Sequence, residues 1–274
     1  MRTTVLLVIL LAALFGAAVL WSEVVSSPSL ELAFFDVGQG DAIYFETPQG
    51  HQVLIDGGAD EKVLSRLGEV MPFWDKTLDL VVLTHPEADH LVGLIAVFKR
   101  YEVSNVLWSG KEKDTKAFAA FKEALKEVGA RILMAEAGQR ILLGNSGAFL
   151  EILYPKNEID AQKETSNESS VIMRLVFREH EALLTGDTVK KIEAYLVEAG
   201  TDITADILKV AHHGSNTSSS KGFLEMVAPE VAVISIGKDN SYGHPHPETL
   251  ANLAEYGIDV RRTDQEETIF FYLK

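Results

Sequence analysis

Hydrophobic and polar positions alternate in short blocks along most of the chain, and each apolar block ends at glycine, proline or acidic residues. Blocks of this kind are typical of strands. They predict strands over residues 30–37, 42–46, 52–55, 78–83, 131–134, 149–153, 171–177, 182–185, 207–210, 231–236 and 268–273. Amphipathic segments predict helices over residues 61–71, 118–128, 189–199 and 247–256. The polar segment 157–169 is expected to be an exposed loop. Strands outnumber helices and occur in blocks, which predicts two sheets sandwiched between helices in one domain.

The N-terminal segment has a different pattern. Residues 5–21 are all apolar or glycine, with Arg2 before them and Glu23 after them. At about 1.5 Å rise per residue, this run covers most of a bilayer core. Its flanking charges favour a cytoplasmic N-terminus and an extracytoplasmic remainder. The small residues 16–18 make a cleaved signal peptide the alternative, but the apolar run continues past them. We therefore expect one transmembrane helix with its linker over residues 1–29 and a globular domain over residues 30–274.

Composition narrows the chemistry. The chain of 274 residues contains no cysteine, which excludes disulfides, thiolate metal sites and cysteine nucleophiles. Its formal net charge of −15 argues against broad, sequence-independent binding of a nucleic-acid backbone. Two divalent cations would remove about four of those charges at one place, where an anionic substrate could then bind.

The segment 84–93 is the densest group of candidate metal ligands. It follows the predicted strand 78–83 and offers, within six residues, His85, Glu87, Asp89 and His90. A short loop of this composition can hold two metal ions a few ångströms apart. Imidazole and carboxylate ligands without thiolates suit zinc, manganese or iron. The alternative is an ordinary strand-to-helix turn in which Asp89 caps a helix that begins near Leu91.

Further polar clusters follow other predicted strands. Because strand ends of layered α/β folds converge on one edge, these clusters are expected to meet there. In order along residues 30–274, the chain contains the phrases FFDVGQGDA, LIDGGAD, LTHPEADHLVGL, NESSVIMRL, LLTGD, LKVAHHGSNTSSS and YGHPHP. These phrases resemble the metallo-β-lactamase superfamily. More closely, they resemble the hydrolase domain of ComEC-type DNA-internalisation competence proteins. The resemblance implies a four-layer αββα sandwich with a site for two divalent metal ions.

The resemblance also implies ligand roles. His85 and Glu87 would hold one ion, Asp89 and His90 the other, and Asp187 would bridge them. The tandem His212-His213 would supply the last ligand; we favour His213, with His212 contacting the substrate, although the order stays open. Two positions depart from the usual pattern: Glu87 replaces a histidine, and Asn167 replaces another. Both changes make the first site richer in oxygen, which favours Mn²⁺ or weakly held Zn²⁺.

Several residues are expected to support the site, and each has an ordinary alternative. Asp56 either stabilises its turn or hydrogen-bonds to a ligand. Asp36 and Asp41 are expected to form turns and support the site without binding metal. Asp187 is favoured as a ligand over an N-cap for the helix that follows it.

Other residues are candidates for contact with the substrate. Lys209 either contacts phosphate or is a surface lysine. Ser215 and Ser218 either touch an anion or belong to an exposed loop. His244 is favoured as a substrate contact over a rigid loop residue beside Pro245.

Together these features predict a membrane-anchored, extracytoplasmic two-metal phosphodiesterase or nuclease acting on DNA or nucleotides. His212, His244 and Lys209 would stabilise the charged transition state, and Asp89 or another nearby carboxylate would orient the nucleophile. A role in competence and DNA uptake would require a separate channel protein. One alternative is hydrolysis of a lactam, thioester or phosphocholine ester on the same fold. The other is a non-enzymatic, metal-stabilised envelope adaptor. The ligand set argues against it, because the chain retains His85, Asp89, His90, Asp187 and His213.

Overall fold

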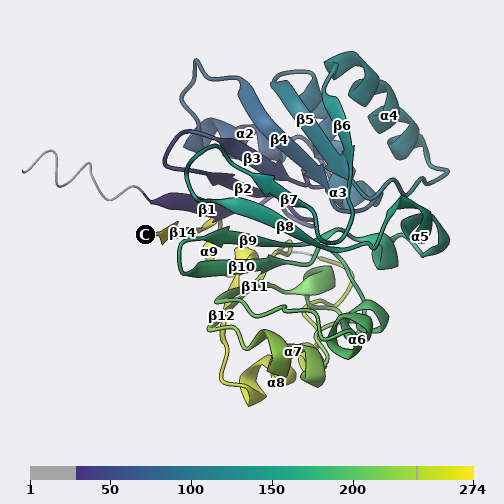
Figure 1. The fold of residues 1–274 in the computed structure, drawn as a ribbon, viewed down its shortest axis with the longest axis vertical. Helices are drawn as coiled ribbons and strands as arrows, with labels where there is room; N and C mark the ends of the chain where they lie inside the picture. The colour runs from purple at the N-terminus through teal and green to yellow at the C-terminus, as the bar shows by residue number, and fades with distance from the viewer. Residues whose placement is uncertain (1–28, 239) are drawn as a thin grey trace, which may run out of the picture.

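The computed structural model describes residues 29–238 and 240–274, which form two seven-stranded sheets (Figure 1). The first sheet has the strand order β14-β1-β2-β3-β4-β5-β6. Its strands are β1 (Leu30–Phe34), β2 (Ile43–Glu46), β3 (Gln52–Ile55), β4 (Thr77–Leu83), β5 (Glu102–Trp108), β6 (Arg131–Met134) and β14 (Ile269–Leu273). Strands β3 to β6 run parallel, whereas β14, β1 and β2 pair antiparallel.

The second sheet has the order β13-β12-β11-β10-β9-β8-β7. Its strands are β7 (Arg140–Leu142), β8 (Phe149–Tyr154), β9 (Ile172–Phe177), β10 (His180–Leu184), β11 (Ile207–Lys209), β12 (Val231–Ile234) and β13 (Asp259–Arg262). Strands β10 to β13 are parallel. Each sheet therefore contains a block of parallel strands. The carboxyl ends of the two blocks lie at the same edge of the sandwich.

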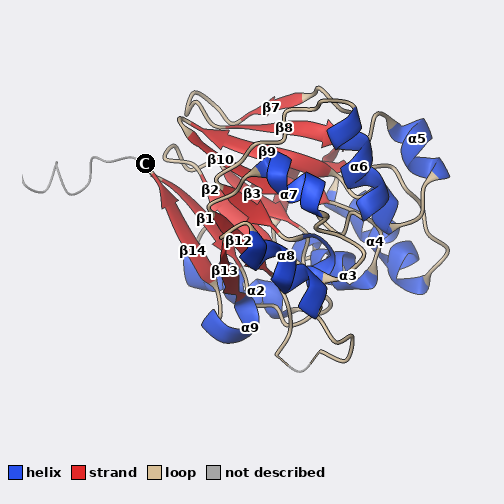
Figure 2. Ribbon diagram, turned by 90° about the horizontal axis from the view of Figure 1, so that it is seen from below, coloured by secondary structure: helices blue, strands red, loops and turns tan. Residues whose placement is uncertain are grey.

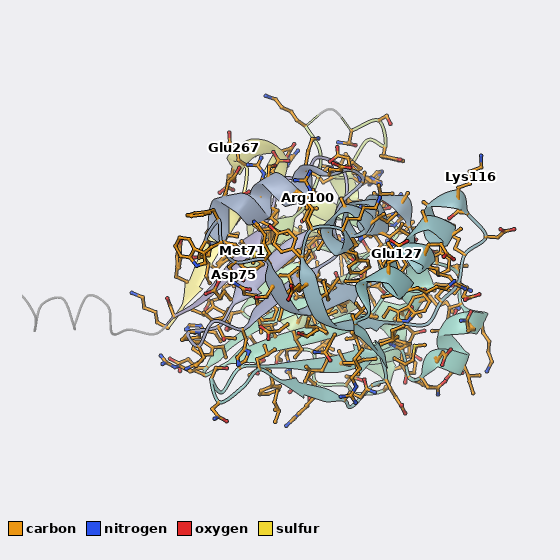
Figure 3. All side chains as sticks on the ribbon, turned by 90° about the horizontal axis from the view of Figure 1, so that it is seen from above. Met71, Asp75, Arg100, Lys116, Glu127 and Glu267 are labelled. Atoms are coloured by element: carbon orange, nitrogen blue, oxygen red, sulfur yellow. The ribbon has the colours of Figure 1, made fainter. Side chains whose placement is uncertain are left out.

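Helices cover the outer face of each sheet (Figures 1 and 2). The first sheet carries α2 (Lys62–Val70), α3 (Ala88–Phe98) and α4 (Lys116–Val128). The second sheet carries α6 (Lys190–Glu198), α7 (Lys221–Val227) and α8 (Pro247–Glu255). Shorter elements are α5 (Glu158–Lys163), α9 (Thr263–Glu266) and the 3₁₀ turns η1 (Asn167–Ser169) and η2 (Ala211–Gly214). Charged side chains such as Lys116 and Glu127 of α4 lie on the exposed side of their helix (Figure 3).

Three apolar clusters hold these layers together. The central cluster joins the two sheets and includes Phe34, Phe45 and Phe177. A second packs α2, α3 and α4 on the first sheet, and a third packs α6, α7 and α8 on the second. Because burial of apolar area is the main stabilising term in folding, these clusters account for the four-layer order helix, sheet, sheet, helix. The predicted αββα sandwich is confirmed.

The expectation of an exposed loop over residues 157–169 is wrong in part, because the segment contains α5 and η1. The Asn157 side chain caps α5 by accepting a hydrogen bond from the Asp160 backbone N–H at 3.0 Å, and Ala161 is buried beneath the helix. Strands β5, β7 and β13 and helices α7 and α9 are also present without having been predicted as elements. Helix α3, considered only as an alternative with Asp89 as its cap, begins at Ala88, and its N-cap position is Glu87.

The predicted membrane anchor, residues 5–21, lies outside the described residues. Within residues 29–238 and 240–274, no helix is both long and apolar enough to cross a membrane.

Candidate metal centre

The candidate ligands lie at the carboxyl ends of the parallel strands. Residues 84–90 follow β4, Asp187 follows β10 and His213 follows β11. A backbone hydrogen bond joins the two sheets at this edge, where the Val171 N–H donates to the Thr84 carbonyl at 2.9 Å. The edge therefore brings together segments that are far apart in the sequence, as expected for strand ends in layered α/β folds.

Two glycines allow the loops at this edge to pack closely. A Cβ at Gly93 of α3 would lie 1.8 Å from the Gly57 carbonyl oxygen, so no larger residue fits there. This close approach places the loop after β3 against the helix that carries His90. The Gly57 N–H donates to the His90 carbonyl at 2.7 Å, which fixes the same contact.

Four side chains form the centre of the site. Asp89, His90, Asp187 and His213 each place one ligand atom within 4.8 Å of the others. Asp187 Oδ2 lies 3.4 Å from both His90 Nε2 and His213 Nε2 and 3.8 Å from His85 Nε2. Asp187 thus faces all three imidazoles. The N-cap position of α6 is Val189, so Asp187 does not serve as the cap that was its alternative role.

This donor set fits a divalent cation. Nε2 of His85, His90 and His213 and Oδ1 of Asp187 are buried, and they have no hydrogen-bond partner among the described residues. Buried polar atoms without partners are costly, and divalent cations bound among these residues would satisfy them. Imidazole nitrogen and carboxylate oxygen are donors that zinc and manganese accept.

The other ring nitrogen of each histidine is held in place. His90 Nδ1 lies 2.7 Å from Asp56 Oδ2, and His213 Nδ1 lies 2.9 Å from the Ser235 carbonyl oxygen. His85 Nδ1 lies 3.0 Å from Thr84 Oγ1, which in turn donates to Asp56 at 2.7 Å. Such contacts fix the tautomer and aim Nε2 at the centre. Of its two alternatives, Asp56 adopts the hydrogen bond to a candidate ligand.

Charges inside the site are strongly coupled. Burial lowers the pKa of His213, but the neighbouring carboxylates of Asp187 and Asp41 outweigh burial and raise this pKa to about 10. Burial also opposes ionisation of Asp187, but His213 and His90 hold its pKa well below the usual range. Burial, together with the charge of His90, lowers the pKa of His85 to about 3. The carboxylate of Asp187 is therefore charged and His85 neutral at neutral pH.

Glu87 does not join the central cluster. Its carboxylate accepts hydrogen bonds from the Lys113 ammonium group, on the loop that precedes α4. The side chain nevertheless lines the same pocket as Asp89 and Asp187. Contrary to the expectation that His85 and Glu87 form a pair of ligands, the structure brings His85 to the centre and leaves Glu87 at the rim.

The metal centre opens into a pocket of about 210 Å³. Its wall is formed by Gln39, Glu87, Asp89, Asn167, Asp187, His212, His213, Tyr242 and His244. Asn167 Nδ2 lies 3.4 Å from His212 Nε2, and the rings of His212 and His244 are 5.8 Å apart. Burial lowers the pKa of both His212 and His244, so both rings are neutral at neutral pH.

The two tandem histidines take different roles. Both have a left-handed backbone, with φ of 50° at His212 and 52° at His213. This conformation is uncommon outside glycine and typical of functional sites. It sends His213 into the buried cluster and leaves His212 half-buried on the pocket wall.

Lys209 is the main correction. It is 0% exposed, and its Nζ lies 2.8 Å from Asp41 Oδ2 and donates to the Val210 carbonyl at 3.0 Å. Neither alternative for Lys209 describes its position: the side chain is not on the surface, and it does not line the pocket in which a phosphate could bind. Asp41 is buried as well, and its Oδ1 lies 3.5 Å from His213 Nδ1.

Three other candidates lie outside the pocket wall. Ser215 and Ser218 are buried, and Ser218 Oγ donates to the Ala211 carbonyl at 2.9 Å. These serines therefore shape the loop: they are neither exposed nor part of the pocket wall, so neither of the two alternatives describes them. Asp36 accepts from the Gly38 N–H at 3.0 Å and pairs with Arg66 at 3.7 Å, as expected for a turn residue.

Sequence reasoning missed the pocket residues Gln39 and Tyr242, and also Lys113. Gln39 and Tyr242 lie inside polar clusters that follow strands, so that position was an available signal. Lys113 has no such signal, because it lies in a charged segment of lysine and acidic residues.

Comparison with known proteins identifies the family of this chain. A family model described as the metallo-beta-lactamase superfamily matches residues 35–238. The chain is 32% identical over 265 residues to ComE operon protein 3 of Bacillus subtilis (strain 168), an alignment that covers 89% of this chain. It is 31% identical over 256 residues to competence protein ComA of Neisseria gonorrhoeae, covering 92% of this chain. Both alignments cover 33% of the relative, so the chain spans about a third of the length of these curated relatives.

Solved structures show the same fold at low sequence identity. Igni18, a metallo hydrolase of Ignicoccus hospitalis, has a TM-score of 0.58 at 16% identity and matches 90% of this chain and 100% of its own. CmlA, a diiron beta-hydroxylase of Streptomyces venezuelae, has a TM-score of 0.57 at 13% identity. The match covers 90% of this chain and 55% of CmlA. With the family match over residues 35–238 and the candidate metal centre at the sheet edge, the chain belongs to the metallo-β-lactamase superfamily and resembles its ComEC-type competence branch.

Proposed function

We propose that this chain is a metal-dependent phosphodiesterase that acts on DNA or nucleotides in the cell envelope. One observation carries the proposal. The metal centre opens into a small polar pocket whose wall adds two neutral imidazoles and two amides, from His212, His244, Asn167 and Gln39. Groups of this kind donate hydrogen bonds to phosphoryl oxygens without carrying a charge that would have to be desolvated.

Within this proposal, the residues divide between two ions. Asp89, His90, Asp187 and His213 would hold one divalent cation, and His85 with a shared Asp187 would hold a second, which Glu87 could complete. Bound Zn²⁺ or Mn²⁺ supplies Lewis acidity, which lowers the pKa of water and polarises a phosphoryl oxygen. The nitrogen and oxygen donors suit both metals.

The chain's own residues supply orientation and charge stabilisation. The neutral rings of His212 and His244 can donate N–H groups to negative charge that develops on the phosphoryl oxygens. The Asn167 amide lies within 3.5 Å of both ring nitrogens of His212 and restricts the orientation of that ring. Asp89 is the more exposed carboxylate of the cluster, with 29% of its side chain accessible against 4% for Asp187. Asp89 therefore suits the role of orienting the attacking water.

Relatives named for competence support a link to DNA uptake, in which a DNA channel protein would be the partner. Because the net charge of −15 repels a nucleic-acid backbone over most of the surface, the DNA substrate is expected to contact the protein mainly at the metal pocket.

Turnover and metal content together test the reaction class. The purified protein, loaded with Mn²⁺ or Zn²⁺, is assayed on bis-p-nitrophenyl phosphate, single-stranded DNA and a chromogenic lactam. Asp187→Ala should remove bound metal and turnover together. His244→Ala should retain metal and lower kcat on the order of 10²–10³, the usual effect of losing one positioned donor.

His246→Ala is the matched control, since His246 caps α8 by accepting from the Glu248 N–H and does not line the pocket. It should leave kcat and metal content unchanged. Absence of phosphodiester cleavage with both metals would contradict the proposal, and lactam cleavage alone would identify a different hydrolase on the same fold.

We further propose that residues 5–21 anchor the protein with its catalytic domain outside the cytoplasm. Their apolar composition and the flanking Arg2 and Glu23 support this orientation. Protease added to intact cells should then remove the domain. Protection in intact cells with digestion only after lysis would indicate the reverse orientation.

A further inference from the structure

A second pocket is lined by residues of α5 and α6 and of the segment that follows β8. Its volume is about 260 Å³. It is lined by Tyr154, Lys156, Asp160, Lys163, Glu164, Lys191, Ile192 and Tyr195. Three lysines line it beside two carboxylates, and a third carboxylate, Glu168, pairs with Lys191, so the lysines are balanced locally in a chain whose net charge is −15.

The turn η1 separates this pocket from the metal centre. Asn167 lines the metal pocket, whereas the next residue, Glu168, pairs with Lys191 at 3.2 Å. Glu164 pairs with Lys191 at 2.5 Å and lines the second pocket. The two pockets therefore lie on either side of η1: Asn167 belongs to the wall of the metal pocket, and Glu168 pairs with a lysine in the wall of the second pocket.

The wall of the second pocket combines aromatic rings with ammonium groups. The rings of Tyr154 and Tyr195 meet edge to face with centroids 6.1 Å apart. Lys156 Nζ lies 4.5 Å from the centre of the Tyr195 ring. Single-stranded nucleic acid is bound by this combination, because bases stack on aromatic faces and phosphates pair with lysines.

Lys156 is the cation most available to a ligand. Its side chain is exposed, and it forms no ion pair within the described part of the chain. By contrast, Lys191 is paired with Glu164 and Glu168, and Lys163 is paired with Asp160 at 3.2 Å. A cation without a carboxylate partner can bind phosphate without first breaking an ion pair.

We propose that this pocket, hereafter the lysine–tyrosine pocket, binds the nucleotide next to the scissile phosphodiester of a single strand. Lys156 binds its phosphate, and its exposed side chain moves off the Tyr195 ring to do so. The base then stacks on Tyr195. This inference rests on the proposed phosphodiesterase function and specifies its substrate as single-stranded, because a base inside a duplex cannot reach an aromatic face.

Binding and turnover of an eight-nucleotide oligothymidine test the proposal. Anisotropy of a labelled phosphorothioate oligonucleotide, whose backbone resists cleavage, is measured on the metal-loaded full chain in detergent. Lys156→Ala should weaken binding about fivefold and lower the slope of log affinity against log salt by about 0.7, the value for one lost phosphate contact. Tyr195→Ala should weaken binding about tenfold and leave that slope unchanged, since stacking is not an ionic contact.

Turnover by the metal-loaded protein separates this pocket from the catalytic site. For both variants KM should rise for the oligonucleotide, whereas kinetics on bis-p-nitrophenyl phosphate should match the wild type, because that substrate is too small to reach the second pocket. Lys126→Ala is the control: Lys126 lies on α4, is 66% exposed and pairs with Glu123 at 2.8 Å. It should change neither binding nor turnover.

The outcomes distinguish the two proposals. Wild-type cleavage of phosphodiesters with unchanged oligonucleotide binding in both variants overturns the lysine–tyrosine pocket alone. Weaker binding in both variants, with no cleavage by the wild type, supports the pocket as a nucleotide site and overturns the phosphodiesterase. Failure of the wild type to bind the oligonucleotide overturns the pocket as a binding site.

Discussion

The Lys113 ammonium group donates to both carboxylate oxygens of Glu87 at the rim of the metal pocket. The two side chains are 34% and 28% exposed, so the pair is neither buried nor fully solvated. Glu87 lies between His85 and Asp89 in sequence, yet only those two neighbours face the central cluster. The two expected ion sites are therefore unequal: one has four converging ligands, and the other depends on releasing Glu87 from Lys113.

Replacing Lys113 with methionine should strengthen binding of the second metal ion and leave the first unchanged. The substitution removes both the competing partner of Glu87 and a nearby positive charge. We expect about fivefold tighter binding, since a partly exposed ion pair contributes up to ~1 kcal/mol. Titration calorimetry with Mn²⁺ and metal analysis after dialysis measure the two affinities.

Lys111→Met is the control for this prediction. Lys111 lies on the same loop, but its ammonium group donates to the Gln162 and Glu164 carbonyls at 2.8 and 2.5 Å. The inequality of the two sites would be contradicted if the wild type bound both ions with equal affinity and Lys113→Met changed neither affinity.

Asp56→Asn should weaken metal binding by about 10- to 100-fold, the usual effect of losing a carboxylate that supports a histidine ligand. The substitution weakens the hydrogen bond that fixes His90 Nδ1. Asp36→Asn is the matched control, because Asp36 contacts its own turn and Arg66. Competition with a chromogenic chelator gives both affinities, and equal affinities for the two variants would exclude the role assigned to Asp56.

Lys209→Met should lower the free energy of unfolding and should not act by removing a contact with the substrate. It leaves the Asp41 carboxylate buried and without its cation, and breaking a buried pair in this way costs about 3–5 kcal/mol. The double variant Asp41→Asn/Lys209→Met should recover part of that loss. Urea unfolding gives the free energies, and an unchanged stability together with a lower kcat would restore Lys209 as a catalytic candidate.

Metal binding should release protons at neutral pH. The pKa of His213 is about 10 in the metal-free site, because Asp187 and Asp41 outweigh the effect of burial. Its ring is therefore protonated at pH 7, and a metal ion must displace that proton to bind Nε2. Affinity should rise by about tenfold per pH unit for each proton released, over pH 6–8. Calorimetry at pH 7 in buffers of different ionisation enthalpy counts the protons, and a count of zero would contradict this protonation state.

Much of the fold follows from local patterns in the sequence. Apolar blocks such as residues 78–83 and 171–177 identify strands, because a strand buried on both faces needs a continuous apolar run. Helix α3 shows the limit of this reasoning. Its segment Leu91–Phe98 is almost entirely apolar and carries no polar stripe, so periodicity alone does not distinguish it from a buried strand.

The sequence by itself determined the candidate chemistry: histidines and carboxylates at strand ends, with no thiolates, in the order typical of one superfamily. Only the tertiary structure decided what each polar side chain contacts. Lys209 is paired with Asp41, 168 positions earlier, and Glu87 with Lys113, 26 positions later. A local pattern describes which face of its own element a residue occupies. The partner across a buried edge depends on how separate strands and loops pack, and that packing distinguishes a buried structural lysine from a substrate contact.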